Sequence, residues 1–167
     1  NSATARTLYY IASEESATKG TPSDPALSDG NFWNSWHLTD EYGLNLDDVW
    51  TDYTGENVKV AVFDSGFNYT HAELVSNFNT TDDIDVLDDD TDSTNSNDST
   101  HGTHVSLMIA ADDNNSRSVG VAFDSEIIGM RRGFGSDSSS QDTLDGFEHV
   151  LTSNADIMNN SWGTTAA

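Results

Sequence analysis

The stretch that decides the fold is Val58-Lys59-Val60-Ala61-Val62-Phe63-Asp64-Ser65-Gly66. Its first six residues are mostly β-branched, apolar or aromatic, and such runs are typical of strands that are buried on both faces. The last three residues predict a tight turn at the end of that strand. Asp64 is therefore expected at the carboxyl end of a buried parallel strand, where open α/β sheets place their active sites.

The chain downstream supplies further elements of an α/β fold. The periodicity predicts helices at 105–111 and 144–151 and strands at 126–131 and 155–160. Residues 79–100 contain eight Asp and many Ser, Thr and Asn, so we predict a long loop there. Alternating strands and helices imply right-handed crossovers, and we predict a parallel β-sheet with flanking helices. The last strand would leave an open edge, so the sheet is expected to be incomplete at its C-terminal side.

The chain has 167 residues, which fits one domain. After a short apolar patch from Leu8 to Ala12, the chain up to residue 31 becomes rich in Ser, Asp, Gly and Pro, and residues 1–28 are interpreted as an N-terminal arm or linker. Residues 29–167 are interpreted as the N-terminal portion of one domain, whose first apolar anchors are Trp33, Trp36 and Leu38.

The composition is strongly acidic, with 29 Asp and Glu against 6 Lys and Arg and a formal charge of −23. Such a surface repels phosphates and anionic lipids, so neither nucleic acid nor a membrane is expected as a partner. No apolar run approaches the roughly 18 residues that a membrane span needs. Adaptation to brine and specific ion binding both explain the acidity, and both stay open. The absence of cysteine excludes disulfides and thiolate metal sites.

Two further motifs carry polar groups that are suited to chemistry. His101-Gly102-Thr103-His104 opens a predicted helix, and Asn159-Asn160-Ser161-Trp162-Gly163 leaves the last predicted strand. His101 is a candidate base, but it is also a candidate helix cap. With His104 at i, i+3 it is a candidate zinc ligand, for which the spacing supplies no third partner.

Together, the strand ending in Asp64, the His101 motif and the exit at residues 159–163 resemble the subtilisin-like serine proteases (subtilases). Their order and spacing are most similar to the kexin/furin-like branch and its bacterial secreted relatives, from about Asp29 to Gly163. The resemblance implies a secreted endopeptidase in which Asp64 and His101 belong to an Asp-His-Ser triad. It also implies an extended polypeptide substrate between the backbones of two segments. These are Ser161, Trp162 and Gly163 on one side and Gly133 and Gly135 on the other.

The nucleophile that the resemblance implies lies in a Gly-Thr-Ser-x-Ala motif, which this sequence does not contain. We therefore expect the serine in a C-terminal segment or in a second chain, and we expect the 167-residue chain alone to be inactive. Ser65 also replaces the second Asp of furin-like enzymes, which weakens the expectation of a preference for basic substrates.

The resemblance also implies calcium as a cofactor, held by oxygen ligands. A first site would use Asp85, Asp90 and Asp92, which a solvated acidic loop also explains. A second site would use Asp29, Glu73 and Asn115 and would clamp the N-terminal arm onto the domain. The rival to a protease is a non-catalytic, calcium-braced acidic module, such as a pseudo-protease or a component of a surface layer or filament.

Overall fold

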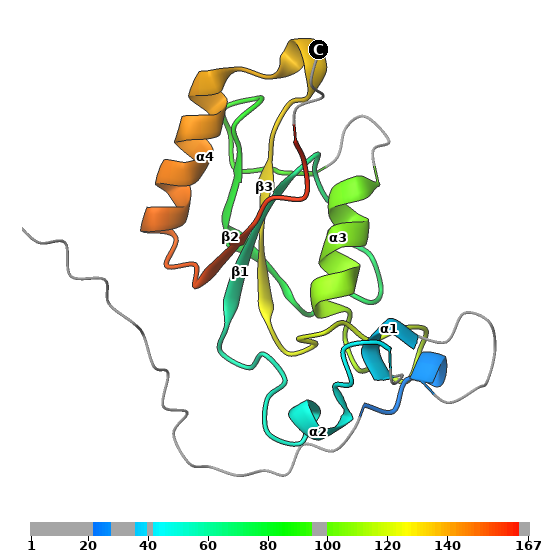
Figure 1. The fold of residues 1–167 in the computed structure, drawn as a ribbon. Coiled ribbons are helices and arrows are strands. Elements are labelled where there is room, and N and C mark those ends of the chain that lie inside the picture. The colour runs from blue at the N-terminus through cyan, green and yellow to red at the C-terminus, as the bar shows by residue number, and fades with distance from the viewer. Residues whose placement is uncertain (1–21, 28–35, 40–41, 95–99, 164–167) are drawn as a thin grey trace, which may run out of the picture.

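The computed structural model describes residues 22–27, 36–39, 42–94 and 100–163. Its centre is a four-stranded parallel sheet in the order β2-β3-β1-β4 (Figure 1). The strands are β1 (Lys59–Asp64), β2 (Phe78–Asp85), β3 (Glu126–Arg131) and β4 (Ile157–Asn159). The prediction of an α/β fold with a parallel sheet is therefore confirmed.

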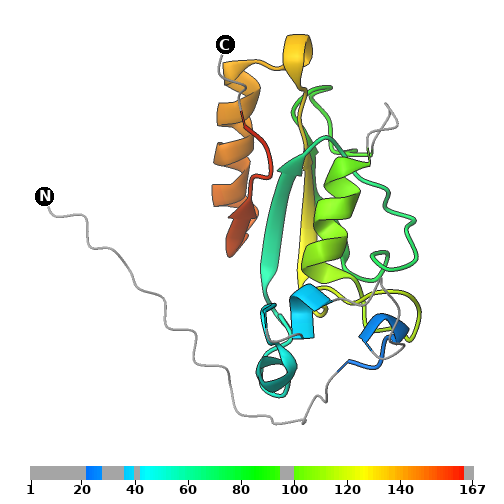
Figure 2. The same cartoon turned by 45° about the vertical axis from the view of Figure 1, so that its right-hand side comes forward.

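Helices cover both faces of the sheet (Figures 1 and 2). Helix α3 (His101–Ala110) lies over one face and α4 (Ser140–Thr152) over the other. Alternate residues of β1 face the two helices. Val60 and Val62 pack in the cluster that includes Ala110 of α3. Ala61 and Phe63 pack in the cluster against which Val150 of α4 lies. This division follows from the two-residue period of a strand, and it explains why β1 has no polar alternation.

Helix α4 lies close to the sheet because of a glycine and a well-formed start. Its N-cap is Ser139, whose side chain accepts a hydrogen bond from the Asp142 backbone while the Asp142 carboxylate accepts one from the Ser139 backbone. A Cβ atom at Gly146 would lie 2.4 Å from Cζ of Phe63. Only glycine therefore lets the helix pack this tightly against β1.

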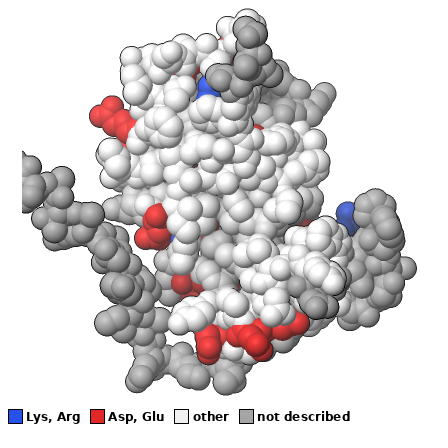
Figure 3. All heavy atoms as spheres, in the orientation of Figure 1, with Lys and Arg blue, Asp and Glu red and all other residues white. Residues whose placement is uncertain are grey.

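The remaining described elements are short and lie at one end of the molecule or beside β3. They are η1 (Pro25–Leu27), α1 (Trp36–Thr39), α2 (Asp47–Trp50) and η2 (Gly135–Asp137). Leu38, Leu46 and Trp50 form a small core of their own with Val119 and Phe123. Acidic side chains gather on the end where α2 lies, and basic ones are sparse on the face that Figure 3 shows. No described helix is both long and apolar enough to cross a membrane.

One sequence-based prediction was wrong in detail. Residues 78–85 form β2 rather than part of a loop, because this polar stretch pairs with β3 and buries Asp83 and Asp85. The helix that the His101 motif was predicted to open begins at His101 and ends at Ala110. The 1–28 arm is described only at residues 22–27, which contact the loop after α3 through Ser23 and Asp24.

Candidate active site

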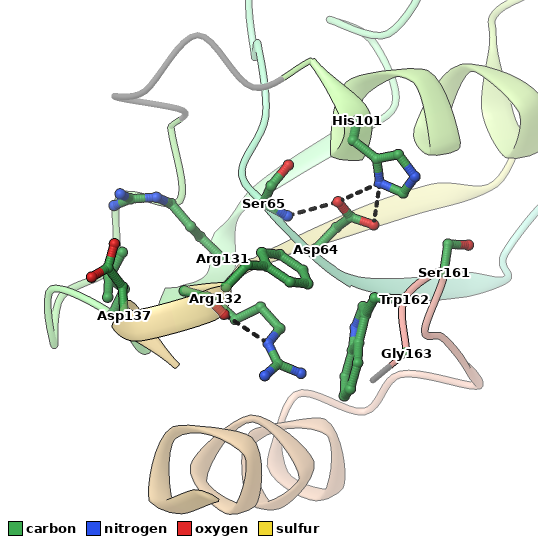
Figure 4. A pocket seen from close by; sticks show the side chains of 12 residues that line it. Asp64, Ser65, His101, Arg131, Arg132, Asp137, Ser161, Trp162 and Gly163 are labelled. Atoms are coloured by element: carbon green, nitrogen blue, oxygen red, sulfur yellow. Dashed lines mark hydrogen bonds and ion pairs between the residues drawn. The ribbon is translucent and has the colours of Figure 1, made fainter. Parts of the chain in front are cut away.

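Asp64 and His101 form a hydrogen-bonded pair at the end of β1 (Figure 4). Nδ1 of His101 lies 2.8 Å from Oδ1 and 3.0 Å from Oδ2 of Asp64. The carboxylate is fully buried, whereas 57% of the His101 side chain is exposed. A buried carboxylate at Nδ1 favours the tautomer with its proton there, which leaves Nε2 free to accept a proton.

The local sequence explains why the two side chains meet. Asp64 is the last residue of β1 and His101 the first of α3. A Cβ atom at Gly102 would lie 2.6 Å from the carbonyl oxygen of Gly66, so glycine is needed for the helix to start against the turn after β1. The Asn68 amide donates to the Thr103 hydroxyl at 3.0 Å, which fastens the same junction.

The pair borders a pocket of about 520 Å³ at the carboxyl ends of the strands. Four of the five predicted substrate-binding residues line this pocket, namely Gly133, Ser161, Trp162 and Gly163. The fifth, Gly135, lies in η2 with φ +66° and is not among the lining residues. Trp162 is held in place by a 2.7 Å hydrogen bond from its indole nitrogen to the carbonyl oxygen of Phe63.

Sequence reasoning missed the basic side of this pocket. Arg131 and Arg132 line it, together with Phe134 and Asp137. Arg131 is in register with Asp64, since β3 pairs with β1 and both strands end at the same edge. The signal was available in Arg131-Arg132 at the end of a predicted strand, because the carboxyl ends of parallel strands converge.

A zinc site at His101 and His104 finds no support in the geometry. Among the residues that the structure describes, no three His, Asp or Glu side chains gather as a metal site. Nδ1 of His101 is already occupied by Asp64.

The sequence profile of the subtilase family matches residues 55–167, which include Asp64, His101 and the whole pocket. The chain belongs to the subtilase family. The predicted resemblance is confirmed, and the pair of Asp64 and His101 at the pocket is thus part of a subtilase fold.

Similar proteins include both bacterial and animal subtilases. Minor extracellular protease Vpr of Bacillus subtilis is 34% identical over 131 residues, which are 73% of this chain and 16% of Vpr. Neuroendocrine convertase 2 of Homo sapiens is 29% identical over 159 residues, 85% of this chain and 24% of the convertase. A protease from Pseudoalteromonas arctica has a similar structure, with a TM-score of 0.76 and 26% identity over 89% of this chain and 52% of that one. The chain thus spans about half of that solved subtilase and a smaller part of the two other proteins.

The acidic segment that begins at the last residue of β2, residues 85–92, pairs with a cation from β3. The Arg131 guanidinium donates hydrogen bonds to Asp85 and, at 2.6 Å, to Asp88. Asp85 and the Arg131 side chain are almost completely buried. Asp85 and Asp90 are joined by two backbone hydrogen bonds, and Asp92 accepts from Thr94, which lowers the pKa of Asp92. The structure therefore brings the predicted calcium ligands Asp85 and Asp90 together beside an arginine.

A second group of oxygen atoms surrounds Glu73. Both carboxylate oxygens of Glu73 are buried without a hydrogen-bond partner in the described structure, and so is Oδ2 of Asp24. Burial, together with the nearby carboxylates of Asp113 and Glu73, raises the pKa of Asp24 to about 6. Ser23 donates to Asp113 and, at 2.8 Å, to Asn115, so these residues share one region.

Buried carboxylates without donors are costly unless a cation pairs with them, and hard oxygen donors fit calcium. The residues around Glu73 therefore fit a calcium ion. Asp24 is one of them, and sequence reasoning missed it. Asp29, which was predicted for this position, lies outside the described residues.

Proposed function

We propose that this chain supplies the Asp and His of an Asp-His-Ser triad in a serine endopeptidase. The observation that carries the proposal is the contact of His101 with the buried Asp64 at the edge of the pocket. His101 would take the proton of the attacking serine and return it to the leaving amine. Asp64 would hold the imidazole in its reactive tautomer and stabilise the imidazolium.

The substrate is proposed to be a polypeptide in an extended conformation. Gly133 lines the pocket together with Ser161, Trp162 and Gly163, and the backbone of these two segments suits a peptide that adds as a strand. Secretion is proposed with it, since one relative is named an extracellular protease.

The nucleophilic serine is proposed to come from polypeptide outside these 167 residues, on the same chain or on a second one. A fluorophosphonate probe applied to the complete native protease should label one serine, and peptide mapping should place that serine outside this sequence. Absence of any labelled serine in folded material would refute the proposal and would favour the non-catalytic, calcium-braced module.

Calcium is proposed to bind between Asp24, Glu73 and Asn115, with Asp29 as a further candidate. When bound, it would supply positive charge to the buried carboxylates and tie residues 22–27 to the loop after α3. We expect calcium at about 100 times its Kd to stabilise the complete protease by about 2.7 kcal/mol, measured as an upward shift of its Tm.

The variant Glu73→Gln separates this effect from general screening of acidic charge. It should lose most of the calcium-dependent shift, and in chelator its Tm should equal or exceed that of the parent because an unpaired buried charge is gone. Asp47→Asn, an exposed acidic residue of α2, is the matched control and should keep the whole shift. An equal calcium response in both variants would contradict the proposed site.

A further inference from the structure

Arg132 lies at the edge of the pocket, tied through its backbone to the candidate catalytic aspartate. Its amide donates to the carbonyl oxygen of Asp64 at 2.8 Å. Its guanidinium carbon lies 3.7 Å from the ring centroid of Trp162 and 5.0 Å from that of Phe134 (Figure 4). Arg132 is only 7% exposed, so a positive charge is buried between aromatic rings at the site.

The hydrogen-bond partners of this buried guanidinium among the described residues are neutral. Nε donates to the carbonyl oxygen of Gly133 at 3.2 Å, and Nη2 donates to the Ser138 hydroxyl at 2.7 Å. Nη1 is buried and has no hydrogen-bond partner among the described residues. Burial lowers the pKa of Arg132, although an arginine stays charged at neutral pH.

This arrangement is unusual in a chain with 29 carboxylates. Other buried or half-buried cations in the described structure have acidic partners: Arg131 pairs with Asp85 and Asp88, and Lys59 pairs with Asp82 and Glu126. Among the described residues, no carboxylate forms an ion pair with the Arg132 guanidinium within 4.0 Å, and Asp142 and Asp64 act on it only from a longer distance. A buried charge that is left unpaired in this way is costly, and a carboxylate that arrives with a ligand would remove that cost.

We propose that Arg132 is a specificity-determining residue that binds an acidic side chain, Asp or Glu, of the polypeptide substrate. The inference rests on the proposed function, since it assigns a substrate preference to the same pocket. The incoming carboxylate would accept a charge-assisted hydrogen bond from Nη1. Phe134, which covers the guanidinium and is 41% exposed, offers the route to Nη1 by rotating its side chain.

The acidic surface of the protein restricts the preference for an acidic residue to a single position of the substrate. The formal charge of −23 repels acidic peptides as a whole. Only the substrate residue whose side chain reaches Arg132 gains from a carboxylate, so glutamate is expected to be favoured there and disfavoured elsewhere along the peptide.

The test uses the complete protease and pairs of peptides that differ by Glu or Gln at one position, with both ends blocked. At one position the Glu peptide should show at least a tenfold higher kcat/KM than the Gln peptide. Arg132→Leu should bring that ratio to about one, through a much larger loss of kcat/KM for the Glu peptide than for the Gln peptide. Arg132→Lys should keep part of the ratio. Lys59→Gln, at the other end of β1, removes the same charge and should leave the ratio intact. Peptides with a free C-terminal carboxylate test whether the chain end, rather than a side chain, is bound.

Binding measured by tryptophan fluorescence separates this inference from the proposed function, because Arg132 stacks on Trp162. Tighter binding of the Glu peptide that Arg132→Leu abolishes would support the inference even if no peptide is cleaved, in which case the proposed function fails. Cleavage without a Glu preference would overturn the inference and leave the proposed function standing. Equal losses for both peptides in Arg132→Leu would also overturn it, since they indicate a purely structural role.

Discussion

Replacing Asp64 with asparagine is expected to lower kcat of the complete protease by about 10⁴-fold at neutral pH. Asparagine has the same shape and can still accept the 2.7 Å hydrogen bond from the Ser65 amide, so the turn should persist. Its amide group removes the negative charge from His101 and can hold the wrong tautomer, with the proton on Nε2. Steady-state hydrolysis of a blocked peptide measures the loss.

The control for this prediction is Asp145→Asn, which removes an exposed carboxylate of α4 that does not line the pocket. It should change kcat little, and both variants should unfold at nearly the parental Tm. Because triad residues act as a unit, adding Asp64→Asn to His101→Ala should cost little beyond His101→Ala alone. Retention of more than a tenth of the parental kcat by Asp64→Asn would contradict the proposed role of Asp64.

The central part of the fold follows from local sequence. Strand β1 is an apolar run buried on both faces, and its pattern depends on its own residues alone. Gly55 before β1 and Gly66 after it, both with positive φ, also carry local signals of turns. The position of Asp64 at a strand end, and of His101 at a helix start, could therefore be predicted without knowledge of the tertiary structure.

The parts that could not be predicted depend on distant partners. The polar sequence of β2 predicts a loop. The segment forms a strand because β3 supplies its hydrogen bonds. Asp24 was missed because its neighbours, Ser116 and Glu73, are far away in the sequence. The roles of Arg131 and Arg132 likewise depend on which side of the strand end each side chain takes. The Arg131 side chain pairs with Asp85 and Asp88. The Arg132 side chain lies over the ring of Trp162.

Arg131→Met should destabilise the complete protease by about 3–5 kcal/mol, the usual cost of breaking a buried ion pair. Methionine fills a similar volume but leaves the buried Asp85 carboxylate without its cation. The free energy of unfolding in urea measures this loss, with the protease blocked by a phosphonate to prevent autolysis. Lys59→Met breaks a more exposed pair and should cause a much smaller loss.

The double variant Arg131→Met with Asp85→Asn tests the cause of this loss. Asparagine can keep the 2.8 Å hydrogen bond from the Leu87 amide while it removes the charge, so the double variant should recover a large part of the stability. Calcium offers a second rescue, because Asp85 and Asp88 lose the cation that pairs with them. If Arg131 takes the place of the ion, calcium should stabilise Arg131→Met more than the parent. A loss below about 1 kcal/mol, as for a surface pair, would instead mean that Arg131 does not hold Asp85 in solution. Calcium binding and a solvated acidic loop, the two explanations that the sequence left open, would then be separated by whether calcium raises the Tm of the parent.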